Sequence, residues 1–326
     1  MTAYLLVNFG GPRDLSEIPS FLEELLLDPD VIRTKFPRWL HEWFFRRVAK
    51  KRALSVAKDY EKIGGKSPIF FDTEKMKEAF FLQFRAPCMT FHRYLPMTHE
   101  ESILTIEGCK SKEIRVVPMF PQFCYATTGS IARFFERNLS LETRAKLQWV
   151  RSYPDHPAFI EAWKRQIRRF LKEQSLDEKE TILLFSAHGL PRSFIEEGDP
   201  YEKECRRSVQ EIVREFPQVL SRLAYQSKFG RGEWLRPSTI ETCQEILQWC
   251  EGRKNVVIVP ITFTSDHIET LFEIEELYLP PIREKGLQAY RLPALNLDPF
   301  WISMFAQIAK TTPTYPNASL VNPSLT

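Results

Sequence analysis

Four short hydrophobic runs stand out along the chain, and each is rich in β-branched side chains. The runs are continuous rather than alternating, which is typical of strands that are covered on both faces. Each run leads through a loop into a stretch with helical periodicity, and the clearest of these begins at Pro157. This repeated order of strand, loop and helix predicts an α/β fold with doubly wound parallel sheets. The four runs cover residues 4–9, 114–120, 182–185 and 256–263.

The length of the chain and a short internal sequence similarity predict two similar halves. The chain has 326 residues, which suits two domains. VVPMFPQF at 116–123 and VIVPITFT at 257–264 both run from apolar residues through a proline into a polar loop. We predict an N-terminal domain over 1–150, a C-terminal domain over 151–311, and a loose, Pro- and Asn-rich tail over 312–326.

The composition narrows the class of protein. The chain carries 45 Lys plus Arg against 42 Asp plus Glu, a net charge of +3, so we expect no bulk nucleic-acid binding. Hydrophobic residues make up 43%, which excludes collagen, coiled coil and wholesale disorder. The 25 Phe, 7 Trp and 10 Tyr against only 12 Gly suit a large core or a pocket for a flat apolar ligand.

Cysteine spacing and the N-terminus predict a cytoplasmic protein. The six cysteines contain no C-x-x-C pair, so neither a disulfide framework nor a zinc site is indicated. The N-terminal MTAYLLVNFGG lacks the basic region of a signal peptide. No apolar stretch reaches the ~18–20 residues that span a bilayer.

Two histidines follow predicted strands, at the sheet edge where α/β proteins bind ligands. His188 ends ILLFSAH, and His267 precedes IETLFEIEEL. A helix starting at Asp266 would place Glu269 and Glu273 on one face, with Ile268, Leu271 and Phe272 toward the core. Like charges at this spacing destabilise a helix by a few tenths of a kcal/mol, so a divalent cation, shared protons or an imidazolium would offset them. We predict a His/carboxylate site for a divalent metal or for acid–base chemistry at a domain cleft; a solvated acidic face is the alternative.

Segment 28–68 combines aromatic and basic residues. Phe36, Trp39 and Trp43 precede the basic run RRVAKKR at 46–52. Such a helix can lie on a membrane surface, cover a cleft that takes an apolar, acid-bearing ligand, or simply dock on the protein. GGKSP at 64–68 lacks the G-x-x-x-x-G-K-[ST] pattern, so nucleotide binding there is rejected.

Eight stretches together resemble ferrochelatase. The resemblance extends nearly to residue 309 and implies two Rossmann-like domains with the active site in the cleft between them. It implies a lyase of haem biosynthesis that inserts Fe(II) into protoporphyrin IX, forms protohaem and releases two protons. The stretches are LLVNFGGP at 5–12, LLLDPDVI at 25–32, YEKIGGKSPI at 60–69, PQFCYATTGS at 121–130, FSAHGLP at 185–191, GDPY at 198–201, YQSKFGRGEWL at 225–235 and FTSDHIETLFEI at 263–274.

The resemblance also assigns site residues. His188 matches the family histidine at the metal and porphyrin centre, and Glu269 matches its carboxylate partner, so these two are the predicted metal-contacting pair. Asp266, His267 and Glu273 match the polar line that leads away from it and complete the predicted catalytic set. Segment 28–68 becomes a lip over the porphyrin. The predicted porphyrin-binding residues are Phe9, Arg52, Tyr60, Ser67, Arg93, Tyr94 and Trp234.

Departures from the family pattern refine these expectations. Phe9 cannot coordinate metal, so no axial ligand is expected there, and the poorer fit to the coproporphyrin branch favours protoporphyrin. Lys66 replaces a frequent glycine. Tyr125 stands where cluster-bearing members have cysteine, and no C-terminal ligands follow Cys250, so we expect no iron–sulfur cluster and no permanently bound cofactor.

The expected partners and two alternative classes of protein complete the predictions. Protoporphyrin IX and ferrous iron are the expected substrates, no nucleic acid is expected, and peripheral membrane contact is left open. One alternative is a chelatase that loads cobalt or iron into a corrin or sirohaem precursor. The other is a non-catalytic porphyrin carrier, which would need the aromatic cleft but not the clustered Glu269 and Glu273.

Overall fold

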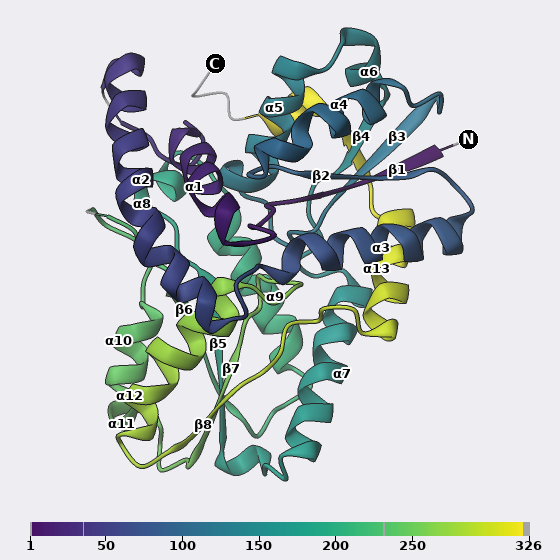
Figure 1. The fold of residues 1–326 in the computed structure, drawn as a ribbon. Helices are drawn as coiled ribbons and strands as arrows, with labels where there is room; N and C mark the ends of the chain where they lie inside the picture. The colour runs from purple at the N-terminus through teal and green to yellow at the C-terminus, as the bar shows by residue number, and fades with distance from the viewer. Residues whose placement is uncertain (1, 35, 231, 322–326) are drawn as a thin grey trace. The chain divides into compact units, whose positions relative to one another are not determined.

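The computed structural model describes residues 2–34, 36–230 and 232–321. The chain divides into two compact units, which are described in turn (Figure 1). Unit 1 comprises Met1–Ser152 and Ala309–Thr326, and unit 2 comprises Tyr153–Ile308. The chain therefore crosses between units at Ser152 and again inside the last long helix.

Unit 1 contains a five-stranded sheet in the order β2-β1-β3-β4-β9. The first four strands are parallel, and β9 runs antiparallel to β4. The strands are β1 (Thr2–Asn8), β2 (Cys88–His92), β3 (Glu113–Pro118), β4 (Leu147–Val150) and β9 (Thr314–Pro316). The helices are α1 (Ile18–Leu27), α2 (Arg38–Lys62), α3 (Pro68–Phe84), α4 (His99–Glu107), α5 (Ser130–Asn138) and α6 (Leu141–Lys146).

The C-terminal segment is ordered within unit 1, and the prediction of a loose tail is wrong for residues 312–321. Tyr315 in β9 pairs with Trp149 in β4. The Trp149 indole N–H donates to the Asn317 side-chain oxygen at 2.9 Å, and Leu320 is buried in the core. β9 is a short strand at the edge of the sheet, where side chains are incompletely buried, so it needs no hydrophobic run. The composition of this segment therefore resembles that of a loop. Residues 322–326 lie outside the described residues.

Unit 2 contains a four-stranded, fully parallel sheet in the order β6-β5-β7-β8. The strands are β5 (Thr181–His188), β6 (Leu220–Gln226), β7 (Asn255–Val259) and β8 (Gln288–Arg291). The helices are α7 (Pro157–Glu173), α8 (Arg192–Glu196), α9 (Tyr201–Val213), α10 (Thr239–Gln244), α11 (Ile246–Trp249), α12 (Leu279–Arg283) and α13 (Pro299–Thr311).

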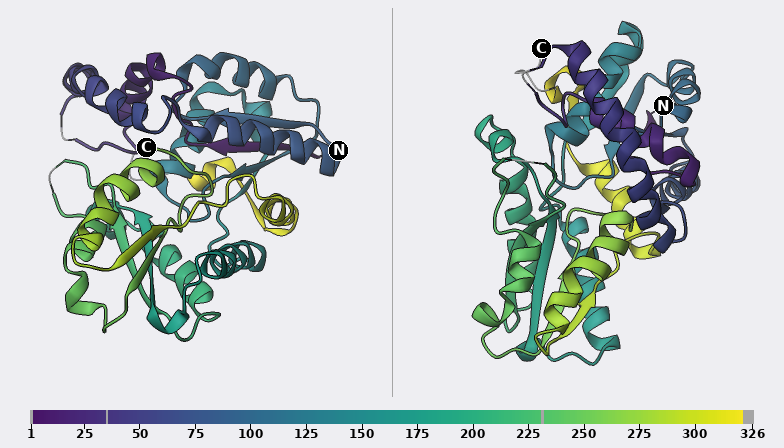
Figure 2. Two further views of the ribbon diagram at one scale, coloured as in Figure 1. Left: turned by 60° about the horizontal axis from the view of Figure 1, so that its bottom comes forward. Right: turned by 60° about the vertical axis from the view of Figure 1, so that its left-hand side comes forward.

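Helices cover both faces of each sheet, as the continuous hydrophobic runs predict. In unit 1, Leu5 packs in a core cluster with residues of α5, whereas its neighbour Tyr4 stacks on Phe84 of α3 on the other face, with ring centroids 4.3 Å apart. In unit 2, α10–α12 lie on one side of the sheet and α7 and α9 on the other (Figure 1); Figure 2 gives two further views. The prediction of two doubly wound α/β units is confirmed.

The two units repeat one strand order. β1 and β5 occupy the same central place, and β3 and β7 lie beside them. The sequence similarity between 116–123 and 257–264 therefore marks equivalent strands. Each of these strands is followed by a π-helical segment, Tyr125–Gly129 in unit 1 and Glu269–Tyr278 in unit 2. π-Helical turns are rare and often mark functional sites, so the end of β7 is where side chains for chemistry are expected.

Candidate active site

His188 is the last residue of β5, and its backbone is fixed on both sides. Its N–H donates to the Thr262 hydroxyl at 3.2 Å, and its carbonyl accepts from the Tyr201 hydroxyl at 3.0 Å. Thr262 lies in the loop after β7 and Tyr201 begins α9. The His188 side chain is 38% exposed, so a rigid backbone presents an accessible imidazole.

Gly189 must be a glycine for steric reasons. A Cβ at this position would lie 2.6 Å from the backbone oxygen of Gln226, the residue to which the Gly189 N–H donates at 2.8 Å. The strand ends of β5 and β6 therefore approach closely just beyond His188.

We expect Gly189→Ala to destabilise the protein by about 1–3 kcal/mol, because backbone rather than a flexible side chain would have to move. The shift would also displace His188, so turnover should fall more than stability alone explains. Urea unfolding together with initial rates at a temperature where the variant is folded measures both effects. Wild-type values for both would contradict the assigned close approach.

His188 forms a close pair with Glu269, the first residue of the π-helix. The His188 Nδ1 and Glu269 Oε2 atoms are 2.7 Å apart, and the Glu269 side chain is 19% exposed. Burial by itself would lower the pKa of His188, but the charge and hydrogen bond of Glu269, with the charge of Glu273, raise it above its ordinary value. Burial would likewise raise the pKa of Glu269, but the charge and hydrogen bond of His188, with smaller contributions from His267 and Ser227, lower it to about 2. The pairing makes His188 a stronger base than a free imidazole.

Ser227 brings a second carboxylate to this pair. Its hydroxyl lies 2.8 Å from Glu269 Oε2 and 2.6 Å from Glu273 Oε2, and the Tyr278 hydroxyl donates to the same Glu273 oxygen at 2.8 Å. Burial, and then the charge of Glu269, raise the pKa of Glu273 to about 7. Glu273 therefore exchanges a proton near neutral pH, which Glu269 does not.

The helix after His267 differs from the predicted α-helix in its winding. Glu269–Tyr278 is a π-helix, and its buried side consists of Thr270, Ile274 and Tyr278. The predicted core side, Ile268, Leu271 and Phe272, is only partly buried, and that prediction is wrong. The buried residues, spaced four apart, lie on the side of the helix opposite to the predicted one. Glu269 and Glu273 nevertheless share a face, as both reach Ser227.

His267 lies beside the pair but makes looser contact with it. The His267 Nε2 and Glu269 Oε1 atoms are 3.8 Å apart, and the ring centroid is 4.5 Å from that of Phe263. Burial lowers the pKa of His267, so its neutral form is favoured near pH 7. Its Nδ1 atom is buried and has no hydrogen-bond partner among the described residues.

The Asp266 side chain forms hydrogen bonds with neighbouring residues of unit 2, and none of these is with His188. Its carboxylate accepts from Arg291 at 3.0 Å, from the Asn296 amide at 2.8 Å and from the Thr270 hydroxyl at 2.8 Å. These contacts fix the loop that leads into the π-helix. A direct part for Asp266 in the chemistry stays a prediction.

Trp234 is the predicted porphyrin-binding residue of unit 2, and it lies close to His188. It forms an isolated antiparallel bridge with Pro191, and a Cβ on Gly189 would lie 3.4 Å from its indole Cε3 atom. The indole therefore packs next to the strand end that carries His188.

In unit 1, Arg93 and Tyr94 belong to a buried network. Arg93 donates to Glu24 at 2.6 Å and to Asp28 at 2.8 Å, and the fully buried Tyr94 donates to Asp28 at 2.9 Å. The Phe9 ring packs on Tyr94 with a centroid distance of 4.4 Å. Two carboxylates already compensate the Arg93 charge here, and the part of Arg93 and Tyr94 in porphyrin binding stays a prediction.

The other predicted porphyrin contacts of unit 1 lie on and after α2. Arg52 is half-buried, whereas Tyr60 and Ser67 are 2% and 1% exposed. A Cβ on Gly11 would lie 2.5 Å from the Ser67 hydroxyl oxygen, so the loop after β1 packs directly against Ser67. Of these three side chains, Arg52 is the accessible one.

The predicted lip consists of α2 and its flanking loops. α2 buries Phe45, Ala49 and Ala53, while Trp39 is 71% exposed and Trp43 carries the Arg47 guanidinium on its ring at 4.2 Å. Across the described parts of the chain, none of the helices combines the length and the apolar character that crossing a membrane requires.

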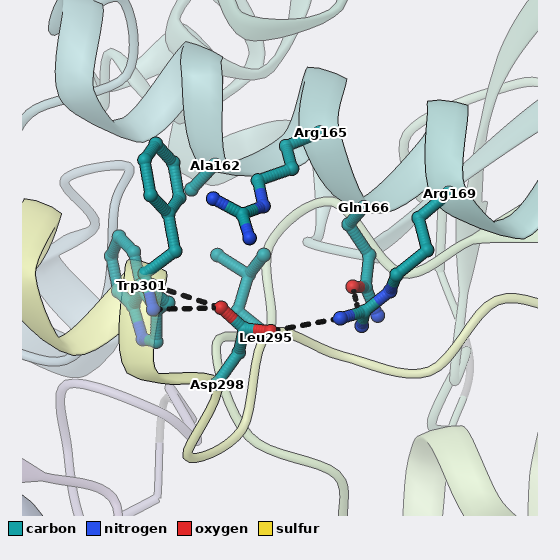
Figure 3. Close-up of a pocket in the computed structure, with 8 residues that line it drawn as sticks. Ala162, Arg165, Gln166, Arg169, Leu295, Asp298 and Trp301 are labelled. Atoms are coloured by element: carbon teal, nitrogen blue, oxygen red, sulfur yellow. Dashed lines mark hydrogen bonds and ion pairs between the residues drawn. The ribbon is translucent and has the colours of Figure 1, made fainter.

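Two further observations concern metal-ligand clusters and cavities. Within residues 2–34, 36–230 and 232–321, no three His, Cys, Asp or Glu side chains gather around a common point for a metal ion. A pocket of about 10 Å³ lies between α7 and the start of α13, does not include His188 in its lining, and holds one water at most (Figure 3). It is lined by Ala162, Arg165, Gln166, Arg169, Leu295, Asp298, Phe300 and Trp301.

Sequence reasoning did not single out several residues that hold the site. Thr262 and Tyr201 fix the His188 backbone, and Ser227 and Tyr278 hold Glu273. Ser227 and Tyr201 lie within the family stretches YQSKFGRGEWL and GDPY, but hydroxyl groups carry no charge pattern that would mark them.

The fold resembles that of solved chelatases. The structure of CbiX, the terminal enzyme for biosynthesis of sirohaem in denitrifying bacteria, matches with a TM-score of 0.51 at 13% identity and covers 95% of this chain and 98% of its own. SirB from Bacillus subtilis with Fe3+ matches with a TM-score of 0.52 at 13% identity and covers 96% of this chain and 95% of its own. At this identity the likeness shows a chelatase-like fold of two parallel-sheet units.

Sequence comparison identifies the family. A family model described as ferrochelatase matches residues 1–312. A ferrochelatase of Chlamydia muridarum is 44% identical over 313 residues, 96% of both chains. A ferrochelatase of Chlamydia caviae is 43% identical over 321 residues, 98% of this chain and 99% of its own. The chain belongs to the ferrochelatase family.

Proposed function

We propose that this chain is a porphyrin metal chelatase of haem biosynthesis that inserts Fe(II) into protoporphyrin IX. Two pyrrole N–H bonds break, the two protons leave, and four nitrogens bind iron in protohaem. The observation that carries the proposal is the accessible His188 imidazole at a rigid strand end, paired at 2.7 Å with Glu269. Family membership supplies the substrate class.

His188 serves as the base that takes pyrrole protons. Imidazole titrates near neutral pH, and the neighbouring carboxylates raise its pKa, which favours proton uptake. Glu269 then stabilises the imidazolium that forms. Glu273, with a pKa of about 7, is suited to pass a proton onward near neutral pH.

The same groups suit an incoming ferrous ion, which is a substrate here. Iron must shed water and yet remain loosely held, and one imidazole nitrogen with one or two carboxylate oxygens suits this better than a closed thiolate cage. His188 and Glu269 are the proposed contacts. We propose no permanently bound cofactor and no iron–sulfur cluster.

The porphyrin itself is proposed to contact the residues that the family resemblance assigns to it. Phe9 and Trp234 are proposed to supply aromatic surface, Arg52, Tyr60 and Ser67 are the proposed propionate partners, and Arg93 and Tyr94 are proposed as further porphyrin-binding residues. The exposed, aromatic and basic character of α2 supports its role as a lip, because a porphyrin is flat and apolar with two carboxylates.

The decisive experiment gives purified protein protoporphyrin IX and Fe(II) without oxygen and follows the absorption spectrum. Formation of protohaem at a catalytic rate is expected. A binding spectrum without turnover would instead identify a porphyrin carrier. Faster metal insertion into coproporphyrin III than into protoporphyrin IX would contradict the proposed substrate.

Arg52→Ala is expected to raise the apparent KM for protoporphyrin more than it lowers kcat. The guanidinium–propionate contact is similar in substrate and transition state, and its loss removes roughly 1.5–3 kcal/mol of binding. A porphyrin ester without free carboxylates should respond little to the change. If the variant loses only affinity for anionic vesicles and keeps its porphyrin kinetics, α2 is a membrane-surface helix instead.

A further inference from the structure

Ser227 adopts a backbone conformation that serine disfavours. It follows β6 directly and has φ of 61°, in the left-handed region where a Cβ clashes and glycine is at ease. Its N–H donates to the Tyr278 hydroxyl at 3.3 Å, which holds the strained backbone in place. A glycine would occupy this position without strain, so the hydroxyl is the group that the position supplies.

That hydroxyl reaches two carboxylates of the π-helix at once. Glu269 Oε2 lies 2.8 Å and Glu273 Oε2 2.6 Å from the Ser227 oxygen. Gln226, one residue earlier, donates from its side-chain amide to the backbone oxygen of Glu269 at 3.1 Å. Residues 226–227 therefore hold the first turn of the π-helix through its backbone and its acidic side chains, against the repulsion between the two glutamates.

We propose that Ser227 is a positioning residue for metal insertion: its hydroxyl donates to one of the two carboxylates and accepts from the other when that one is protonated, which keeps Glu269 and Glu273 side by side to meet an incoming divalent ion beside His188. The proposal rests on the proposed function and deepens it. Without the hydroxyl the two carboxylates separate, which weakens the metal's contacts and leaves the porphyrin's contacts unchanged. The signature is a rise in the apparent KM for metal without a matching rise for porphyrin.

Three variants separate the hydroxyl from the backbone. Ser227→Gly removes the hydroxyl and relieves the strain, so the protein should fold at least as well as the wild type. Ser227→Ala removes the hydroxyl and keeps the Cβ. Ser175→Gly is the matched control, because Ser175 also has a positive φ, 53°, and is exposed just beyond α7, away from the site.

Steady-state insertion of Fe(II) into protoporphyrin IX, with each substrate varied in turn, is the main measurement. Both Ser227 variants should raise the apparent KM for Fe(II) about tenfold, as expected for lost hydrogen bonds to charged groups. Their KM for protoporphyrin and their melting temperature should match those of the control. The proposal is overturned if both variants behave like Ser175→Gly, if only the glycine variant changes, or if both KM values rise equally.

Zinc titration of the porphyrin-free protein by calorimetry tests Ser227 separately from turnover. Zn(II) affinity should fall about tenfold in both Ser227 variants and stay unchanged in Ser175→Gly. If the wild type binds zinc in this way, with the loss in both Ser227 variants, but inserts no metal into any porphyrin, the proposed function fails and the positioning of the two carboxylates for metal binding stands. Equal zinc affinity in the wild type and both Ser227 variants, with normal turnover in the wild type, overturns the positioning role alone.

Discussion

Replacing His188 with alanine is expected to reduce turnover by a factor of about 10²–10⁴, the usual contribution of a general base. The side chain is 38% exposed and adds little to the core, so the variant should fold. Glu269 keeps its contact with Ser227 in the absence of the imidazole, which limits the cost of leaving a carboxylate without its cation. Porphyrin binding should be retained, because the loss concerns the proton acceptor.

The measurement is a pair: single-turnover metal insertion, and porphyrin affinity by fluorescence quenching. His156→Asn is a suitable control, since His156 caps α7 by accepting from the Ala158 N–H at 3.1 Å and asparagine is also a good cap. That variant should insert iron at the wild-type rate. His188→Ala activity within a few-fold of wild type, with normal porphyrin binding, would exclude His188 as the base.

The strands that sequence predicted are the ones at the centre of each sheet. β1, β3, β5 and β7 are buried on both faces and therefore appear as continuous hydrophobic runs. β6 was missed because it is an edge strand with partly exposed residues such as Ser221 and Arg222, so its sequence LSRLAYQ has no apolar run. β2, β8 and β9 are also edge strands, and β4 has only four residues. Hydrophobicity marks burial, and edges are incompletely buried.

The charged residues of the candidate site could be predicted from the sequence, whereas the residues whose role depends on backbone conformation could not. His188, Glu269 and Glu273 were predicted from a strand end and an acidic spacing. In the structure His188 contacts Glu269 directly, and Ser227 links Glu269 to Glu273. Ser227 itself was missed, because its role depends on a left-handed backbone conformation, and nothing in the sequence predicts that conformation at a serine. The π-helical winding was also missed, and the sequence analysis chose the wrong side of this helix for the core, since Ile274 rather than Leu271 is buried.

Glu269 is the residue through which the other site groups are connected. It contacts His188 at 2.7 Å and Ser227 at 2.8 Å, and the His267 Nε2 atom is 3.8 Å from its second oxygen. Its charge is the largest of the effects that raise the pKa of His188 against the opposing effect of burial. Removing that charge without changing the shape therefore tests the electrostatic part of the site.

Glu269→Gln is expected to lower the rate of metal insertion by about 10² or more, while the protein folds and binds porphyrin normally. A base works only above its own pKa, so the raised pKa of His188 sets the acidic limb of the pH–rate profile. Without the Glu269 charge that pKa falls, and the limb should move to lower pH although the maximum rate is smaller. Rates from pH 5 to 9 for wild type, Glu269→Gln and the exposed control Glu276→Gln measure both effects. A profile that keeps its acidic limb in place, or a control that loses rate equally, would show that Glu269 does not set the basicity of His188.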